Sequence, residues 1–334
     1  MKVSAGAHSR FWTLARTAIS VIAGFAAGLA VTWFAGEKPW HVLAILGKSA
    51  FGSWYDLGMT LFYTTPLLLT GLSVAVAFQA GLFNIGAEGQ LTLGALAAAV
   101  AGIVLPRLPW PLAPLAAAAA AFGAGAFWGW IAGWLRAKRG SHEVITTIML
   151  NFVAAGLASY ATLYLFANPD SQNPETRPVG KTFLIHHFST FGAAPVSSAL
   201  FLALAAAALY GFGLKRTSVG FEIKAVGQNE HAARAAGIEP GRIQVLAMTL
   251  AGGLAGLVGV GEVLGNAEKF KLGFSPDFGF VGIAVALLGR GDPLGVVVAA
   301  LLFGALHKGT GDLDFETEHV TRDLSLILQA MVIL

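Results

Sequence analysis

Long apolar runs dominate the chain, and short polar stretches separate them. Several long stretches contain no Asp, Glu, Lys or Arg, among them residues 57–87, 108–135, 144–169, 182–214 and 243–261. A helix of about 20 apolar residues, each rising about 1.5 Å, crosses a hydrocarbon core of about 30 Å. The polar stripes that helices of a soluble protein carry are absent from these runs. The pattern therefore predicts an all-α, polytopic membrane protein.

We expect about ten transmembrane helices in one transmembrane domain that spans residues 1–334. The expected spans cover residues 11–34, 57–80, 90–105, 112–135, 144–166, 196–213, 243–264, 278–289, 293–307 and 323 onward. The first span resembles a signal peptide in its basic flank, but it lacks a small-residue cleavage site and is expected to be retained.

Composition supports the membrane class and excludes several others. Apolar residues make up 56% of the chain and charged residues 12%, against about 45–50% and about 25% in soluble domains. Cysteine is absent, which excludes disulfides and thiolate metal sites. We therefore expect no metal and no cofactor. A net charge of +3 gives no reason to expect nucleic acid as a partner, whereas membrane lipid is expected to surround the spans.

The basic residues predict an orientation. Arg136, Lys138 and Arg139 form one cluster and Lys215 and Arg216 another, both in short segments between spans. Such clusters stay on the cytoplasmic side. We therefore expect the cytoplasmic membrane, with a cytoplasmic N-terminus. Residues 168–181 and 308–322 are then expected to be polar outer loops.

Two segments interrupt the apolar pattern with polar groups and glycines. Residues 79–90 carry Asn84, Glu88 and Gln90 between two spans, and residues 273–282 open an unusually short apolar run. Irregular backbone at membrane depth persists where protein or a water-filled cavity satisfies it. We expect the two segments to line a substrate path, although ordinary interfacial turns would also explain them.

The two breaks occupy corresponding places in the two halves of the chain. In the expected topology, residues 57–166 and 243–334 run with opposite orientation, as inverted repeats do. Phe278 and Phe280, in the second break, are therefore included in the expected path. Glu88 and Glu262 are ionisable groups near the bilayer, and such groups are functional candidates by default. Each could accept hydrogen bonds from a hydroxyl-bearing substrate.

The expected cytoplasmic loop, residues 214–242, contains the signals of a short helix. Asn229 is a suitable N-cap, Glu230 favours the first turn, and Gly237 is a suitable residue after the C-terminus. These signals predict a helix over residues 230–236. A helix this short needs support, either from the inner ends of the chain's own helices or from another subunit.

Catalytic signatures are missing. The chain has no Gly-x-x-x-x-Gly-Lys-Ser/Thr sequence for nucleotide phosphates, no His-Glu-x-x-His sequence and no nucleophile–base constellation. We therefore expect that the chain is not an enzyme.

Three segments resemble a known family, and they cover residues 81–90, 220–238 and 282–289. They read GLFNIGAEGQ, GFEIKAVGQNEHAARAAGI and GIAVALLG. Together they resemble permeases of the branched-chain amino acid/ribose class of ABC importers, and the first is most similar to the simple sugar and nucleoside branch.

The resemblance implies a type II importer fold with two permease subunits, two separate ATPase subunits and an extracytoplasmic solute-binding protein. Residues 220–241 match the family's ATPase-docking segment. The coupling residues carried over to this chain are Gly227, Asn229, Glu230, Ala232, Arg234 and Gly237. The Glu-Ala-Ala signature of other importers is not reproduced, because His231 follows Glu230.

The expected function is that of an importer permease that moves a nucleoside or a simple sugar past Asn84, Glu88 and residues 278–282. Two alternatives stay open. One is an ion-coupled secondary transporter in which Glu88 or Glu262 titrates, and the other is a membrane scaffold. The sequence leaves undecided the exact solute, whether the permease pairs with itself or with a paralogue, and whether the last helix is complete.

Overall fold

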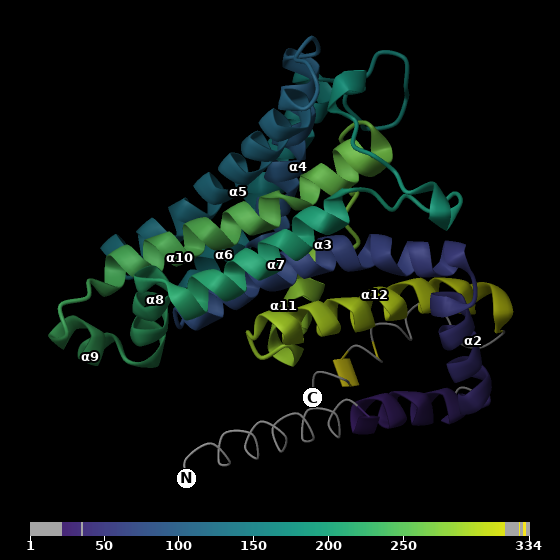
Figure 1. Ribbon diagram of the computed structural model, residues 1–334, viewed down its shortest axis with the longest axis horizontal. Helices are drawn as coiled ribbons and strands as arrows, with labels where there is room; N and C mark the ends of the chain where they lie inside the picture. The colour runs from purple at the N-terminus through teal and green to yellow at the C-terminus, as the bar shows by residue number, and fades with distance from the viewer. Residues whose placement is uncertain (1–21, 35, 318–326, 328–329, 332–334) are drawn as a thin grey trace.

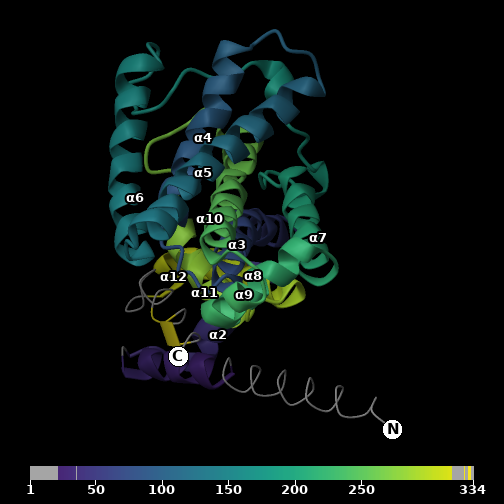
Figure 2. The ribbon, with the colours of Figure 1, turned by 90° about the vertical axis from the view of Figure 1, so that its left-hand side faces the viewer.

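The computed structural model describes residues 22–34, 36–317, 327 and 330–331, which form a bundle of helices (Figures 1 and 2). Extended pairing in this part of the chain is limited to three isolated β-bridges. The α-helices after residue 36 are α2 Pro39–Phe51, α3 Trp54–Gln79, α4 Ala87–Val104, α5 Leu112–Arg139, α6 Glu143–Tyr160, α7 Ala199–Arg216, α8 Ser218–Gln228, α9 Glu230–Ala235, α10 Pro240–Gly256, α11 Phe278–Leu288 and α12 Pro293–Glu316. The prediction of an all-α, polytopic membrane protein is confirmed.

Seven described helices are long and apolar enough to cross a membrane. They cover residues 54–79, 87–104, 112–139, 143–165, 199–216, 240–267 and 293–313. The expected count of about ten is not confirmed. Helix Ile22–Phe34 and α11 are apolar but shorter, and the span expected from residue 323 onward falls almost wholly outside the described residues.

The structure departs from the predicted elements at several places. The run expected as a span over residues 278–289 is α11, whose 11 residues rise only about 16 Å. Residues 308–316 belong to helix α12 rather than to a loop, because Lys308 pairs with Asp56 and Asp312. Helix α2 was not predicted, since its basic residues interrupt its apolar pattern.

Helices α5 and α10 cross with their backbones in direct contact. A Cβ atom added at Gly125 would overlap the carbonyl oxygen of Gly252, and one added at Gly129 would overlap that of Met248. The reverse holds as well, because a Cβ at Gly256 would overlap the carbonyl oxygen of Ala121. The spacing of these glycines is the reason the crossing is so close, as expected for small residues in lipid.

Helix α3 forms the other centre of the bundle. It packs against α7, α10, α11 and α12, and most of its length is buried. Helix α6, by contrast, stands at the edge of the bundle and packs on α4 and α5 (Figure 2). Large apolar side chains such as Phe152 and Ile145 are exposed on α6. A membrane would supply the apolar surroundings that these side chains lack.

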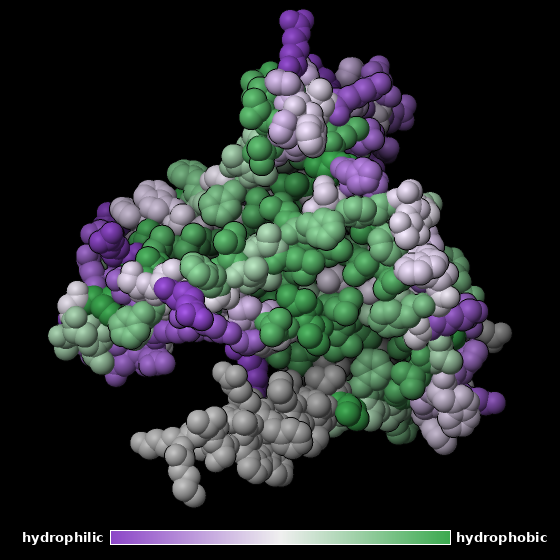
Figure 3. Space-filling model, viewed as in Figure 1, coloured by the Kyte–Doolittle hydropathy of each residue, from purple (hydrophilic) through white to green (hydrophobic). Residues whose placement is uncertain are grey.

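Polar groups gather at two opposite ends of the bundle (Figure 3). One end, here called the α9 end, carries α8, α9 and the turns at residues 79–81 and 289–292. The other, here called the loop end, carries residues 105–111 and 166–198. Between the two ends, hydrophobic residues cover the visible face. The molecule thus has the zoned surface of a membrane-spanning protein.

The segment of residues 166–198 is anchored to the chain that follows α10. Val179 N–H donates to the carbonyl oxygen of Glu268, and Ile185 N–H donates to that of Leu264. Lys269 Nζ lies 2.8 Å from Glu175 Oε1. The hydrogen bond from Lys269, more than any other contact, holds the pKa of Glu175 below its usual range. These hydrogen bonds and this ion pair therefore hold residues 166–198 against the end of the bundle.

Candidate functional site

Two helix N-termini meet inside the bundle, those of α4 and α11. Glu88, in the first turn of α4, accepts a hydrogen bond of 2.7 Å from the N–H of Gly279, in the first turn of α11. A Cβ atom at Gly279 would overlap the backbone nitrogen of Glu88, so the approach requires glycine. The half-buried carboxylate thus lies where the positive ends of two helix dipoles converge.

Asn84, in the turn before α4, and Gln90, in the first turn of α4, support this junction. Each amide nitrogen donates to the other's amide oxygen, at 2.8 Å and 3.1 Å, and both side chains are buried. Asn84 also donates to Ser73 Oγ and accepts from the N–H of Gly86. The polar residues of the first break therefore satisfy one another and fix the irregular turn before α4.

A residue that sequence reasoning missed completes the turn. Asn151, on α6, accepts from the N–H of Gly89 and donates to the carbonyl oxygen of Ile85. Ser275, in the second break, was also missed. It accepts from the N–H of Phe278 and lies beside Glu88. An asparagine within an apolar span was the available signal for the first, whereas nothing distinguished Ser275.

The two predicted path phenylalanines differ in their surroundings. Phe278 is buried, and its ring lies 6.2 Å from that of His307. Phe280 is 44% exposed. The His307 ring also lies 4.4 Å from that of Tyr63 on α3. Of the two, Phe280 has the surface on which a solute could rest, and Phe278 belongs to the packing behind it.

Glu262 lies apart from this junction. It belongs to a π-helical segment, Val260–Ala267, that continues α10, and Asn266 donates to its Oε2 at 3.3 Å. The carboxylate is buried against a small cavity, which Thr65 and Ser197 also line. The structure thus separates Glu262 from Glu88, although both remain candidates for contact with a solute.

The predicted short helix near residue 230 is confirmed as α9, Glu230–Ala235. The Asn229 side chain caps it by accepting from the N–H of Ala232 at 3.0 Å, and Gly237 follows it with a positive φ of 85°. Ala233 is buried, whereas Arg234 and most of the segment are exposed. The chain's own helices support α9 on one side and leave its other side accessible.

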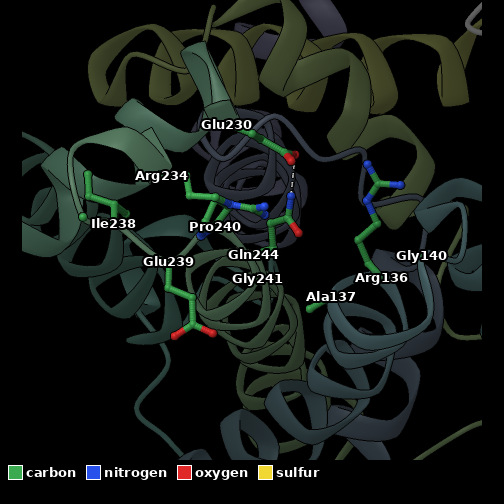
Figure 4. Close-up of a pocket in the computed structure, with 11 residues that line it drawn as sticks. Arg136, Ala137, Gly140, Glu230, Arg234, Ile238, Glu239, Pro240, Gly241 and Gln244 are labelled. Atoms are coloured by element: carbon green, nitrogen blue, oxygen red, sulfur yellow. Dashed lines mark hydrogen bonds between the residues drawn. The ribbon is translucent and has the colours of Figure 1, made fainter. Parts of the chain in front are cut away.

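A polar groove of about 580 Å³ lies between α9, the start of α10 and the end of α5 (Figure 4). Glu230 accepts a hydrogen bond of 2.6 Å from Gln244 Nε2 across one side. Arg136 enters from the α5 side and Arg234 from α9. The predicted coupling residues Glu230 and Arg234 therefore line a surface depression.

Close backbone contacts connect the α9 end to the first break. A Cβ atom at Gly227, at the end of α8, would overlap the carbonyl oxygen of Gln79, at the end of α3. Gln79 and Tyr210 both donate to the carbonyl oxygen of Gly291, Tyr210 at 2.8 Å. These contacts place the end of α8 directly against the end of α3, which leads into the turn that carries Asn84 and Glu88.

The described residues offer no group of three or more His, Asp or Glu side chains that could hold a metal ion. What the arrangement provides is a single carboxylate at a junction of helix ends, joined through backbone contacts to an accessible surface. Such an arrangement can hold a polar solute by hydrogen bonds and can move with a partner, but it lacks a nucleophile with an adjacent base.

The chain is similar to several transport proteins over most of its length. The guanosine ABC transporter permease protein NupP of Bacillus subtilis is 35% identical over 325 residues, which cover 94% of this chain and 90% of the relative. The nucleoside ABC transporter permease protein NupB of Lactococcus lactis is 37% identical over 298 residues, covering 87% and 82%. The glucose ABC transporter permease protein TsgB13 of Haloferax volcanii is 33% identical over 326 residues, covering 95% and 85%. No solved structure matches the chain.

A family of transport permeases matches residues 57–334, which include both breaks and the α9 segment. This match favours the permease hypothesis over an ion-coupled transporter or a scaffold. Permeases of ABC systems work in general with ATPase and solute-binding partners, and the chain itself is the transport subunit and not an enzyme. The chain belongs to the family described as the permease component of branched-chain amino acid transport systems.

Proposed function

We propose that this chain imports a nucleoside or a simple sugar across the cytoplasmic membrane and that Glu88 lines the solute path. Two of the relatives described above are named for guanosine or nucleoside transport and one for glucose. Nucleosides and sugars both carry hydroxyl groups, which can donate hydrogen bonds to a carboxylate. The observation that carries the proposal is the junction at which Glu88 accepts a hydrogen bond from the N–H of Gly279.

The path residues divide into two kinds in this proposal. Glu88 and Phe280 offer a hydrogen-bond acceptor and a partly exposed ring to the solute. Asn84, Gln90 and Phe278 are buried and hold the helix ends in place. Glu262 would act nearer the loop end, beside the cavity that Thr65 and Ser197 line.

Packing supports an inverted-repeat relation between residues 57–166 and 243–334. Helix α3 packs against α11 and α12, while α10 packs against α4 and α5, and α3 and α10 also pack against each other. If α3 is exchanged with α10, α4 with α11 and α5 with α12, the same set of helix–helix contacts results. The counterpart of α6 would fall near residue 323 onward.

The α9 end would face the cytoplasm, with the N-terminus on the same side, because Arg136, Lys138 and Arg139 lie there. The groove between α9 and α5 would receive an ATPase subunit. The loop end would then face the solute-binding protein, and a second permease copy or paralogue would complete the membrane domain. Movement of the ATPase subunits would reach Glu88 through the Gly227–Gln79 contact.

The test is uptake by the complete transporter in proteoliposomes, with the ATPase and solute-binding subunits present. Labelled guanosine, glucose and leucine are compared, each with ATP inside and with an ion gradient in its place. We expect ATP-dependent uptake of guanosine or glucose. Uptake that needs the ion gradient and not ATP would refute the proposal, and uptake of leucine alone would refute the solute class.

A further inference from the structure

A second groove, here called the inner groove, adjoins the one in Figure 4 and shares Ala137, Glu239 and Gly241 with it. Its volume is about 490 Å³. The other residues that line it are Lys138, Arg242, Val245, Leu246 and Thr249. It runs between the end of α5 and the start of α10, the two helices that cross so closely deeper in the bundle.

The inner groove is basic at one end. Lys138 lies in the last turn of α5 and Arg242 in the first turn of α10, and both side chains are exposed. Neither takes part in the ion pairs found among the described residues. Glu239 is the one acidic residue that lines the groove, so two cations outnumber it.

The floor of the inner groove becomes apolar toward the middle of the bundle. Val245 and Leu246 lie one turn beyond Arg242 on α10, and both are half-buried. On α5, Trp134 lies one turn before Lys138 on the same helix face, is 37% exposed and has its ring 6.3 Å from that of Trp130. Exposed tryptophans of this kind are typical of the headgroup level of a bilayer.

We propose that the inner groove binds an anionic phospholipid. Lys138 and Arg242 would bind the phosphate-bearing headgroup, and Val245 and Leu246 would contact the first part of an acyl chain. Basic pockets between transmembrane helices are a recurrent form of anionic headgroup recognition. A soluble phosphate compound would leave the apolar floor uncovered, so the combination of charge and apolar depth favours a lipid.

The test measures lipid binding by native mass spectrometry on the complete transporter, delipidated in detergent. Phosphatidylglycerol and phosphatidylcholine of identical acyl chains are titrated separately. Each basic group near a headgroup contributes about 1 kcal/mol, so two of them predict at least about a tenfold preference for phosphatidylglycerol. The double variant Lys138→Gln/Arg242→Gln is expected to bind both lipids equally. Its melting temperature should match wild type, since both side chains are exposed.

A matched control removes two exposed cations at the same end but outside the inner groove, Arg216→Gln/Arg290→Gln, and should retain the preference. The variant Leu246→Ser should weaken the binding of both lipids while leaving the preference intact. Absence of a preference in wild type, or its equal loss in the control, would overturn the proposal. Displacement of the lipid by glycerol phosphate at equal concentration would also overturn it, since this would indicate a site for soluble phosphates.

Discussion

The α5–α10 crossing and the α4–α11 junction lie in the same bundle but are held together differently. At the crossing, glycines of one helix contact backbone oxygens of the other, and the stabilisation comes from many close dispersion contacts. At the junction, one carboxylate joins two helix ends through the N–H of Gly279. The crossing therefore has no freedom to slide, whereas the junction can open by exchanging a few hydrogen bonds.

The comparison separates a frame from a movable part. Contacts between backbones cannot adapt to a displaced partner, because no side-chain rotamer can change. A hydrogen-bonded carboxylate can exchange its donors for those of a solute at little net change in free energy. We therefore expect substitutions at the crossing to act on assembly and substitutions at the junction to act on transport.

The largest effect is expected from Gly252→Leu at the crossing. Any side chain there would overlap the carbonyl oxygen of Gly125, and overpacking a well-packed site costs about 1–3 kcal/mol, occasionally more. We expect the transporter to be lost from the monodisperse peak in size-exclusion chromatography. Gly123→Leu on α5 is the control, because a Cβ atom at Gly123 meets nothing within 4 Å. Equal damage by both variants would contradict the distinction.

The next effect concerns the junction. Glu88→Gln keeps an acceptor for the N–H of Gly279 but removes the charge, and hydrogen bonds to charged groups contribute about 1.5–3 kcal/mol against about 1 kcal/mol for neutral ones. ATP-dependent uptake should therefore fall about tenfold, while the assembled complex is still recovered. The control is Asp277→Asn, which removes a nearby exposed carboxylate and keeps a residue suited to the positive φ of 61°. Full uptake by Glu88→Gln would assign Glu88 to packing alone.

A smaller effect is expected at the capping residue of α9. Asn229→Ala removes the acceptor for the N–H of Ala232 and should cost the segment about 1 kcal/mol. We expect ATP hydrolysis to continue with reduced solute uptake per ATP. Asn229→Asp, which retains a good capping side chain, should restore the ratio. If both variants behave like wild type, α9 does not transmit motion.

The smallest effect belongs to the loop end. The lowered pKa of Glu175 means that the charged form is stabilised by folding. This contribution is present above pH 4.5, the ordinary value, and is lost as the pH falls through the lowered pKa. Glu175→Gln should lower the melting temperature by a few degrees at neutral pH. At a pH below the lowered pKa of Glu175, the variant and wild type should melt at the same temperature. A constant difference across the pH range would argue against the pair.

The sequence predicted those elements whose physical cause lies in a short, continuous stretch of the chain. The spans follow from uncharged runs, and α9 follows from Asn229 and Gly237, which act within a few residues of where they stand. In each case the physical cause is contained in a short segment of chain.

The rest depends on partners that are distant in sequence. Asn151 is 62 residues from Gly89 in the chain, and no local pattern selects that pairing. Lys308 could be placed in a helix only once Asp56 was known to lie beside it. Asn84 and Gln90 were both assigned to the first break, but that their side chains hydrogen-bond to each other could not be known from their spacing.

The short length of α11 has a practical consequence for mapping the chain in its membrane. Because its 11 residues cover about half of a hydrocarbon core, α11 alone is too short to cross one, and the irregular residues 268–277 precede it. The apolar pattern alone predicts an ordinary span over residues 278–289. The chain contains no cysteine, so a single thiol placed at any of these positions would be the only one to react, and the reach of water-soluble reagents along the segment could be read directly.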